Sequence, residues 1–110
     1  MNLVKTQNFI LMDHLNQIVS RRLGTKPSQT YSRRRNQSCI IARRFFAYAA
    51  YTITEIPMTE IAVFLHYADH SAVHHQIRRM KDMLKHNPTH QTTLDTIEHD
   101  FNLYISGELE

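Results

Sequence analysis

The sequence of 110 residues contains only two glycines and one cysteine. So few glycines argue against a fold built on tight β-turns, which need residues that tolerate a positive φ, and favour helices joined by short connections. The single Cys39 permits no disulfide within the chain, which fits a reducing cytoplasm. No run approaches the ~18 apolar residues of a membrane span, and the first residues lack the pattern of a signal peptide. We therefore expect a single helical, cytoplasmic domain.

Acidic residues are missing from a long basic stretch. Between Arg21 and Arg44 there are eight Lys or Arg residues and no Asp or Glu. Residues 1–55 carry a net charge of +7, and residues 56–110 carry −4. A localised positive block suits a polyanionic partner better than a diffuse excess would. A merely solvated face is the alternative, and composition alone does not separate the two.

Helical spacing of apolar residues covers most of the chain. It predicts helices over residues 3–23, 33–53, 58–65, 70–85 and 91–105. The second helix is apolar on nearly every side from Cys39 onward, which predicts a central position in a bundle with Arg43 and Arg44 on its one solvent-exposed edge. Ser32 and Asp69 are the predicted N-caps of the second and fourth helices. An all-α fold, a small helical bundle, is therefore expected.

The third and fourth predicted helices have the layout of a helix-turn-helix at about residues 58–85. A short helix is followed by a turn of about four residues and by a helix whose apolar stripe begins after its first turn. The early positions that this stripe leaves free are His70, Ser71, Ala72, His74 and His75. A recognition helix contacts base edges with such short, polar or methyl-bearing side chains at its N-terminus. A capped surface helix without a ligand is the alternative.

The run Arg33-Arg34-Arg35 lies at the predicted start of the second helix. Exposed cations at a helix N-terminus oppose its dipole, at a cost of about 0.3–1 kcal/mol each. An anion bound at that terminus would turn this penalty into a gain. The run therefore indicates a phosphate-contacting element, with a solubilising cluster as the alternative.

Several motifs with fixed spacing then identify a family. Ser32–Arg35 resembles a basic loop S-K-R-R, and Arg43 with Arg44 matches an arginine followed by a polar residue. Thr54, Glu60 and Ile61 fit the stretch L-T-x-x-S-L-P-E-I-G, and Asp69–His75 resembles the signature D-H-T-T-V-L-H. In this order and spacing, residues 13–101 resemble the C-terminal DNA-binding domain (domain IV) of the bacterial replication initiator DnaA. The resemblance implies an all-helical bundle with a helix-turn-helix variant of the DnaA domain IV or Trp-repressor-like kind.

The resemblance also implies two kinds of DNA contact, for specificity and for positioning. Arg35 stands where the family inserts an arginine into the minor groove. The positions that read bases in the major groove are Asp69, His70, Ser71 and Ala72. The phosphate-contacting positions are Arg33, Arg34, Arg43, Arg44, His75 and the backbone at Met58 and Thr59.

The sequence departs from the family pattern next to the signature. His66-Tyr67-Ala68 stands where the family has Gly-Gly-Arg, which removes one arginine contact and predicts a stiffer turn. Ala72 keeps only the methyl group of the family's second threonine, while Pro57 and Thr59 replace the usual Ser and Pro. A site other than the standard DnaA box is therefore an open possibility. Residues 1–12 extend beyond the resemblance, and we expect them to lengthen the first helix, to contact a protein partner or to support self-association.

The ATPase part of the initiator has no counterpart in the sequence. Its phosphate loop needs G-x-x-x-x-G-K-[ST], and glycine occurs here only at positions 24 and 107. We expect no enzymatic activity and no cofactor, but double-stranded DNA as the partner and a nucleoid-associated location. A regulator of replication or transcription, a competitor for initiator sites, a phage or mobile-element module, or a piece of a longer protein all fit this pattern.

Eight histidines raise a metal-binding alternative. His66, His70 and His74 are four residues apart, a spacing that suits zinc where all three share one helical face. A third ligand is not evident, because Cys39 lies in an apolar run and no H-E-x-x-H pattern occurs. Imidazoles at the surface or on phosphates, changing charge near neutral pH, explain the pattern more simply. A helical adaptor that contacts a basic protein through the acidic C-terminus is the third class.

Overall fold

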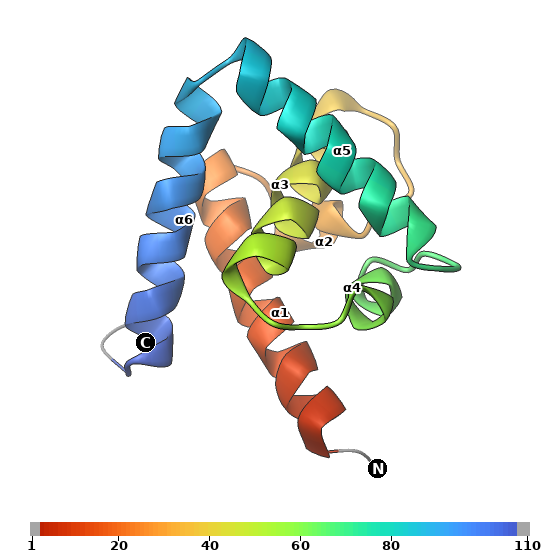
Figure 1. Cartoon of the computed structure of the whole chain (residues 1–110), viewed down its shortest axis with the longest axis vertical. Helices are drawn as coiled ribbons and strands as arrows, with labels where there is room; N and C mark the ends of the chain where they lie inside the picture. The colour runs from red at the N-terminus through yellow and green to blue at the C-terminus, as the bar shows by residue number, and fades with distance from the viewer. Residues whose placement is uncertain (1–2, 108–110) are drawn as a thin grey trace.

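Six helices make up residues 3–107, the part of the chain that this computed structural model describes (Figure 1). They are α1 (Leu3–Leu23), α2 (Pro27–Thr30), α3 (Gln37–Ile53), α4 (Met58–Phe64), α5 (Ser71–His86) and α6 (Thr89–Ile105). No strand occurs within residues 3–107, and the predicted all-α fold class is confirmed. In the same range, no helix is both long and apolar enough to cross a membrane.

Helix α3 is the centre of the bundle, as its apolar surroundings predicted. It packs against each of the other five helices. Phe45, Phe46 and Ala49 on α3 are essentially inaccessible to solvent. The Phe46 ring stacks on Phe64 of α4, with ring centroids 4.9 Å apart. This contact fixes the end of α4, and therefore the start of the turn that follows it, relative to the core.

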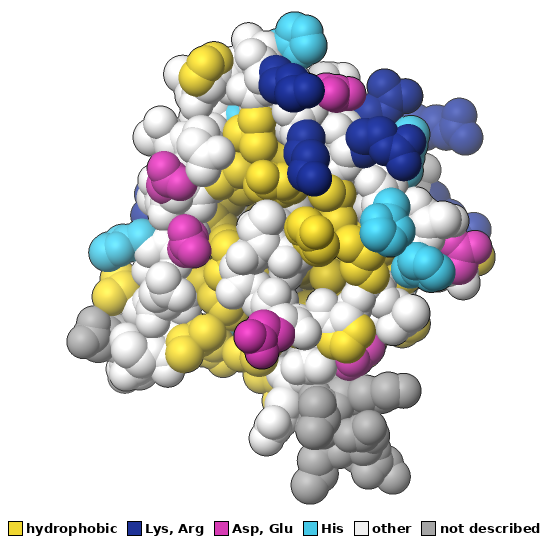
Figure 2. Space-filling view, in the orientation of Figure 1, with side chains coloured by type: hydrophobic (Ala, Val, Ile, Leu, Met, Phe, Trp, Pro, Cys, Tyr) yellow, Lys and Arg dark blue, Asp and Glu magenta, His cyan; other side chains and the backbone are white. Residues whose placement is uncertain are grey.

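Helix α6 carries Asp95, Glu98 and Asp100 with no Lys or Arg, and it packs along α1 and α3. Asp100 is buried and accepts from the Nε and Nη2 atoms of Arg22 on α1, at 2.9 and 2.6 Å. This ion pair holds α6 to the N-terminal helix. In the view of Figure 2, Lys and Arg side chains gather at the upper right, over α5 and behind it, while α6 lies on the opposite side.

The start of α3 differs from the prediction. Asn36, not Ser32, caps this helix, because the Asn36 side chain accepts from the backbone N–H of Cys39 at 3.0 Å. Ser32 instead accepts from the backbone N–H of Arg34 at 3.1 Å. The three arginines therefore lie in a loop ahead of the helix, not in its first turn. Residues 31–36 are called the basic loop below.

The one-turn helix α2 was not predicted, because four residues show no apolar period. It is held by Asn16, a fully buried side chain of α1. Asn16 donates to the carbonyl of Pro27 at 3.0 Å and accepts from the hydroxyl of Thr30. A buried amide that is hydrogen-bonded on both sides fixes α2 on α1, and α2 leads directly into the basic loop.

The remaining boundaries lie within two residues of the expected ones. Residues 3–12 continue directly into the rest of α1, whereas residues 1 and 2 of the predicted extension lie outside the described residues. Val73, Ile77 and Met80 form the buried stripe of α5 as expected, although Leu84 is only partly buried.

Candidate nucleic-acid interface

The turn between α4 and α5 comprises residues 65–70, six residues where about four were expected. It begins with two backbone hydrogen bonds that close the end of α4. The N–H of Tyr67 donates to the carbonyl of Ala62 at 2.9 Å, and that of His66 donates to Val63 at 3.1 Å. Between these bonds the chain reverses through His66, whose φ is +63°. The turn is therefore a fixed structure.

The front end of α5 is open to solvent, as its sequence predicted. Asp69, His70 and Ser71 are exposed, and Ala72 is half-buried. Helix α5 begins two residues after Asp69, whose side chain accepts from the backbone N–H of Ser71 at 2.8 Å and from the Ser71 hydroxyl. These two bonds, the hydroxyl bond first, lower the pKa of the Asp69 carboxyl below its ordinary value. The carboxylate is thus oriented and charged at neutral pH.

The basic loop is shaped by an arginine from inside the bundle. Arg33, Arg34 and Arg35 are exposed, whereas Arg43 on α3 is only 9% exposed. Arg43 donates through Nη2 to the Arg34 carbonyl at 2.9 Å and through Nη1 to the Ser32 carbonyl. The prediction that Arg43 marks a solvent-exposed edge is wrong, because its guanidinium is satisfied by two backbone carbonyls of the loop.

Arg44 occupies the seam between α3 and α5. Its Nη1 lies 3.4 Å from the sulfur of Met83 on α5, and its Nε is buried without a hydrogen-bond partner among the described residues. The side chain as a whole is half-buried. Part of its guanidinium therefore packs in the seam, and the rest is open to a ligand.

The basic loop and the helix-turn-helix turn line one cleft with a volume of about 430 Å³. The arginines of the basic loop therefore lie beside the turn that leads into α5. Among the residues that the structure describes, no Asp or Glu lines the cleft. Its lining residues are Tyr31, Ser32, Arg33, Arg35, Arg43, Leu65, His66, Tyr67, Ala68 and Gln76.

The lining of this cleft includes residues that the sequence analysis did not assign to the interface. Tyr31 and Tyr67 both contribute aromatic surface to it. Tyr67 accepts from the side-chain amide of Gln76 at 3.1 Å. Burial raises the pKa of the Tyr67 phenol, against the opposing effects of the Arg43 charge and the Gln76 bond. The phenol therefore stays neutral and keeps its own proton to donate.

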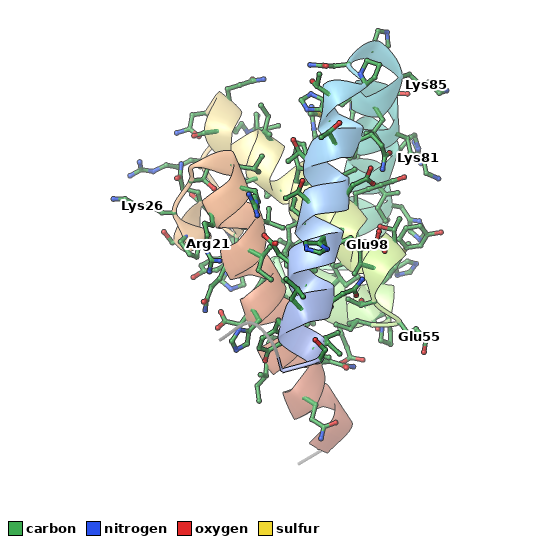
Figure 3. All side chains as sticks on the ribbon, turned by 90° about the vertical axis from the view of Figure 1, so that its left-hand side faces the viewer. Arg21, Lys26, Glu55, Lys81, Lys85 and Glu98 are labelled. Atoms are coloured by element: carbon green, nitrogen blue, oxygen red, sulfur yellow. The ribbon has the colours of Figure 1, made fainter. Side chains whose placement is uncertain are left out.

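The outer face of α5 continues the basic surface beyond its first turn. The exposed residues of α5 beyond its first turn are His74, His75, Arg78, Arg79, Lys81, Asp82, Lys85 and His86, a set with four Lys or Arg and one acid. In Figure 3, Lys81 and Lys85 project from one edge of the molecule and Arg21 and Lys26 from the opposite edge, with Glu98 of α6 between them. A smaller groove of about 170 Å³ brings Met58 of α4 beside Arg78 and Lys81. The sequence signal that could have identified this part of the surface was the i, i+3 spacing of Arg78 and Lys81.

The three evenly spaced histidines do not share one face. His70 and His74 lie close together, with ring centroids 5.5 Å apart. His66 belongs to the turn instead, and its ring lies 5.2 Å from that of Tyr31. Within residues 3–107, no group of three or more His, Cys, Asp or Glu side chains is placed to hold a metal ion.

An exposed helix front, a fixed turn before it and an acid-free cleft shared with an arginine-rich loop define the class: a helix-turn-helix DNA-binding domain. Residues 12–80 match the family described as the bacterial DnaA protein helix-turn-helix. The chain belongs to this family, and the resemblance drawn from its motifs is confirmed.

Curated relatives give the same result. The chain is 36% identical over 78 residues to the chromosomal replication initiator protein DnaA of Campylobacter concisus, covering 71% of this chain and 18% of that protein. The corresponding protein of Campylobacter curvus is 35% identical over the same length and coverage. That of Aliarcobacter butzleri is 30% identical over 92 residues, covering 84% and 21%. The chain thus spans about a fifth of the length of these relatives. No solved structure matches it.

Proposed function

We propose that this chain binds double-stranded DNA with sequence specificity, with the front of α5 in the major groove and the basic loop on the minor groove and its phosphates. The observation that supports this most strongly is the cleft between the basic loop and the turn that leads into α5, which has no Asp or Glu among its described lining residues. A duplex presents two grooves separated by one phosphate backbone, so two reading elements on either side of a cleft match its shape.

We assign base reading to the exposed basic loop and to the front of α5. Arg35 would enter the minor groove from the exposed loop. Asp69, His70, Ser71 and Ala72 would face the base edges in the major groove. A carboxylate accepts from the amino group of cytosine, and a methyl group packs on the methyl of thymine. Because the Ser71 hydroxyl is bonded to Asp69, these two residues would act as one unit.

We assign phosphate contacts to groups that surround the basic loop and the front of α5. The proposed contacts are Arg33, Arg34, Arg44, His75 and the backbone at Met58 and Thr59. The two backbone groups open α4, where first-turn N–H groups have no partner within the helix. We assign Arg43 a positioning role instead of a phosphate contact, because both of its terminal nitrogens bond the basic loop.

The proposed biological setting follows from the relatives, which are replication initiator proteins. We infer that the target resembles an initiator binding site, a DnaA-box-like sequence, and that the chain acts in control of replication or transcription on chromosomal DNA. No phosphate-loop motif occurs in these 110 residues, so this binding would not depend on nucleotide hydrolysis by this segment.

The test of the proposal is binding to duplex DNA as a function of salt. We expect a Kd of about 1 μM or below at low salt, and a loss of roughly 40- to 500-fold between about 50 and 200 mM salt, because three to five phosphate contacts release counterions. Fluorescence anisotropy with a labelled duplex pool measures both. A protein-interaction adaptor would give weak binding or a flat salt response, and either result would contradict the proposal.

A pair of exposed residues separates phosphate contacts from base contacts. Arg34→Ala should weaken binding to cognate and random duplexes equally, by about 3- to 10-fold, and reduce the salt slope by about one contact. His70→Ala should lower cognate affinity alone, by about 5- to 20-fold. The cognate duplex comes from selection on a random pool.

Lys85→Ala is the matched control, since it removes a charge at the opposite end of α5 from the proposed base contacts. Its effect should be smaller than that of Arg34→Ala. If Arg34→Ala and His70→Ala changed the cognate-to-random ratio to the same extent, the assignment of their roles would be wrong.

A further inference from the structure

His66 occupies a backbone position that ordinarily belongs to glycine. Helix α4 ends with a bond from Tyr67 N–H to the Ala62 carbonyl, which requires a left-handed residue between them. Helix α1 ends in the same way, with the Thr25 N–H bonded to the Ser20 carbonyl and Gly24 as the left-handed residue, at φ +70°. Within residues 3–107, the left-handed residues are Gly24, Gly107 and His66 alone.

The use of histidine at this position carries a conformational cost. A side chain with a Cβ is disfavoured at positive φ, where glycine has no such penalty. Gly24 makes the same helix end on α1, which shows that the turn itself needs no side chain. Backbone strain of this kind is concentrated at sites where a side chain has a function. The imidazole is therefore the part of His66 that needs an explanation.

The surroundings of the ring point to an anionic ligand. His66 lines the cleft, with its ring against Tyr31 at 5.2 Å between centroids. The charged groups facing this cleft are all cationic: Arg33 and Arg35 from the basic loop and Arg43 from α3. From α5 and the turn the cleft receives only neutral polar groups, the Gln76 amide and the Tyr67 phenol. A histidine in such a place can donate to an anion without competition from a carboxylate.

We propose that the cleft binds one phosphodiester of the DNA strand that separates the minor groove from the major groove, and that the His66 imidazole donates a hydrogen bond to it. This inference rests on the proposed function. The backbone between a groove read by Arg35 and a groove read by α5 must cross the space between these elements, which is the cleft.

The decisive variant is His66→Gly, because glycine is the best residue for the backbone and has no ring. We expect its Tm to equal that of the wild type or to rise, by up to about 5 °C. Its affinity for a duplex pool should nevertheless fall, by about 3- to 10-fold, because the hydrogen bond from the imidazole to the phosphate is lost. His99→Ala on α6 is the matched control and should change neither quantity.

A phosphate scan then locates the contact. In a duplex selected by the wild-type protein, single phosphates are replaced by neutral methylphosphonates. One replacement should weaken the wild type more than it weakens His66→Gly, which is the coupling expected of a direct pair.

The outcomes separate this inference from the proposed function. If the wild type does not bind duplex DNA, the proposed function fails. If the wild type binds and His66→Gly binds equally well, or if its affinity falls only together with its Tm, the phosphate site is overturned and the proposed function stands. A phosphate scan in which every replacement affects both proteins equally would also overturn it.

Discussion

Replacing Arg43 by methionine should lower both the stability of the protein and its affinity for DNA. The expected loss is about 2–4 kcal/mol in the free energy of unfolding, because two charge-assisted hydrogen bonds disappear and the carbonyls of Ser32 and Arg34 lose their donor. Affinity for duplex DNA should fall by at least about 10-fold. The arginines of the basic loop would no longer be held in one arrangement, and ordering them would oppose binding.

Arg43→Lys distinguishes a positioning role from a direct phosphate contact. A lysine keeps the charge, so it would preserve most of the affinity if Arg43 touched a phosphate. An ammonium group is a compact donor that lacks the planar fork of arginine, so it cannot reproduce bonds to two carbonyls at their present positions. We therefore expect Arg43→Lys to lose more than half of the stability that Arg43→Met loses, as measured by urea unfolding.

Tryptic cleavage in the basic loop gives an independent measurement. Arg43→Lys and Arg43→Met should both be cut faster between residues 33 and 35 than the wild type, because the loop opens more often. The control is Arg34→Ala, which removes an exposed side chain of the loop and should lower affinity at unchanged stability. An Arg43→Lys protein with wild-type unfolding and wild-type cleavage would show that the two carbonyl bonds do not hold the loop.

Arg43 also shows where reasoning from sequence reaches its limit. A charged residue inside an apolar helix predicts a solvent-exposed edge when the sequence offers no acidic side chain to pair with it. Its actual partners are two main-chain carbonyls about ten residues away in sequence, and these have no signature in residue type. The central position of α3 was predictable because apolar residues occur on nearly every side of this helix. The hydrogen-bond partners of Arg43 were not predictable.

The same distinction applies to the turn before α5. The spacing of apolar residues predicted α4 and α5, and short polar residues predicted an exposed helix front. The left-handed conformation of His66 could not be predicted from residue type, because only a few per cent of non-glycine residues adopt it, even though histidine is enriched among them. The cap of α3 was misplaced because Ser32 and Asn36 are both good capping residues, and only the geometry of the loop selects between them.

Replacing Asp69 by alanine should have the largest effect on sequence discrimination. The Asp69 carboxylate fixes the first residue of α5 through Ser71 and is itself a proposed base contact. Its loss should reduce cognate affinity by about 10- to 150-fold. This corresponds to the loss of one good base contact together with the disordering of Ser71, the neighbouring base-contacting residue. Binding to random duplexes should change little or improve slightly, because a negative charge has been removed from a surface that faces phosphates.

The stability of α5 should depend on pH through the same carboxylate. The pKa of Asp69 is lowered in the folded protein, chiefly by the Ser71 hydroxyl, so its bonds stabilise the fold at pH values above the ordinary Asp pKa of about 4. This contribution is lost as the pH falls through the lowered folded-state value. The dependence of Tm on acid pH should therefore be flatter for Asp69→Ala than for the wild type.

Asp69→Asn separates the two roles of this side chain. Asparagine keeps an oxygen that can accept from the Ser71 N–H, and it is among the best residues at a helix start. It loses the charge and presents an amide donor, which no longer favours the amino group of cytosine. We expect Asp69→Asn to retain wild-type stability at neutral pH but to select a different base in a repeated selection from random duplexes. If Asp69→Asn and the wild type selected the same sequence, Asp69 would be a cap for α5 and not a reader of DNA.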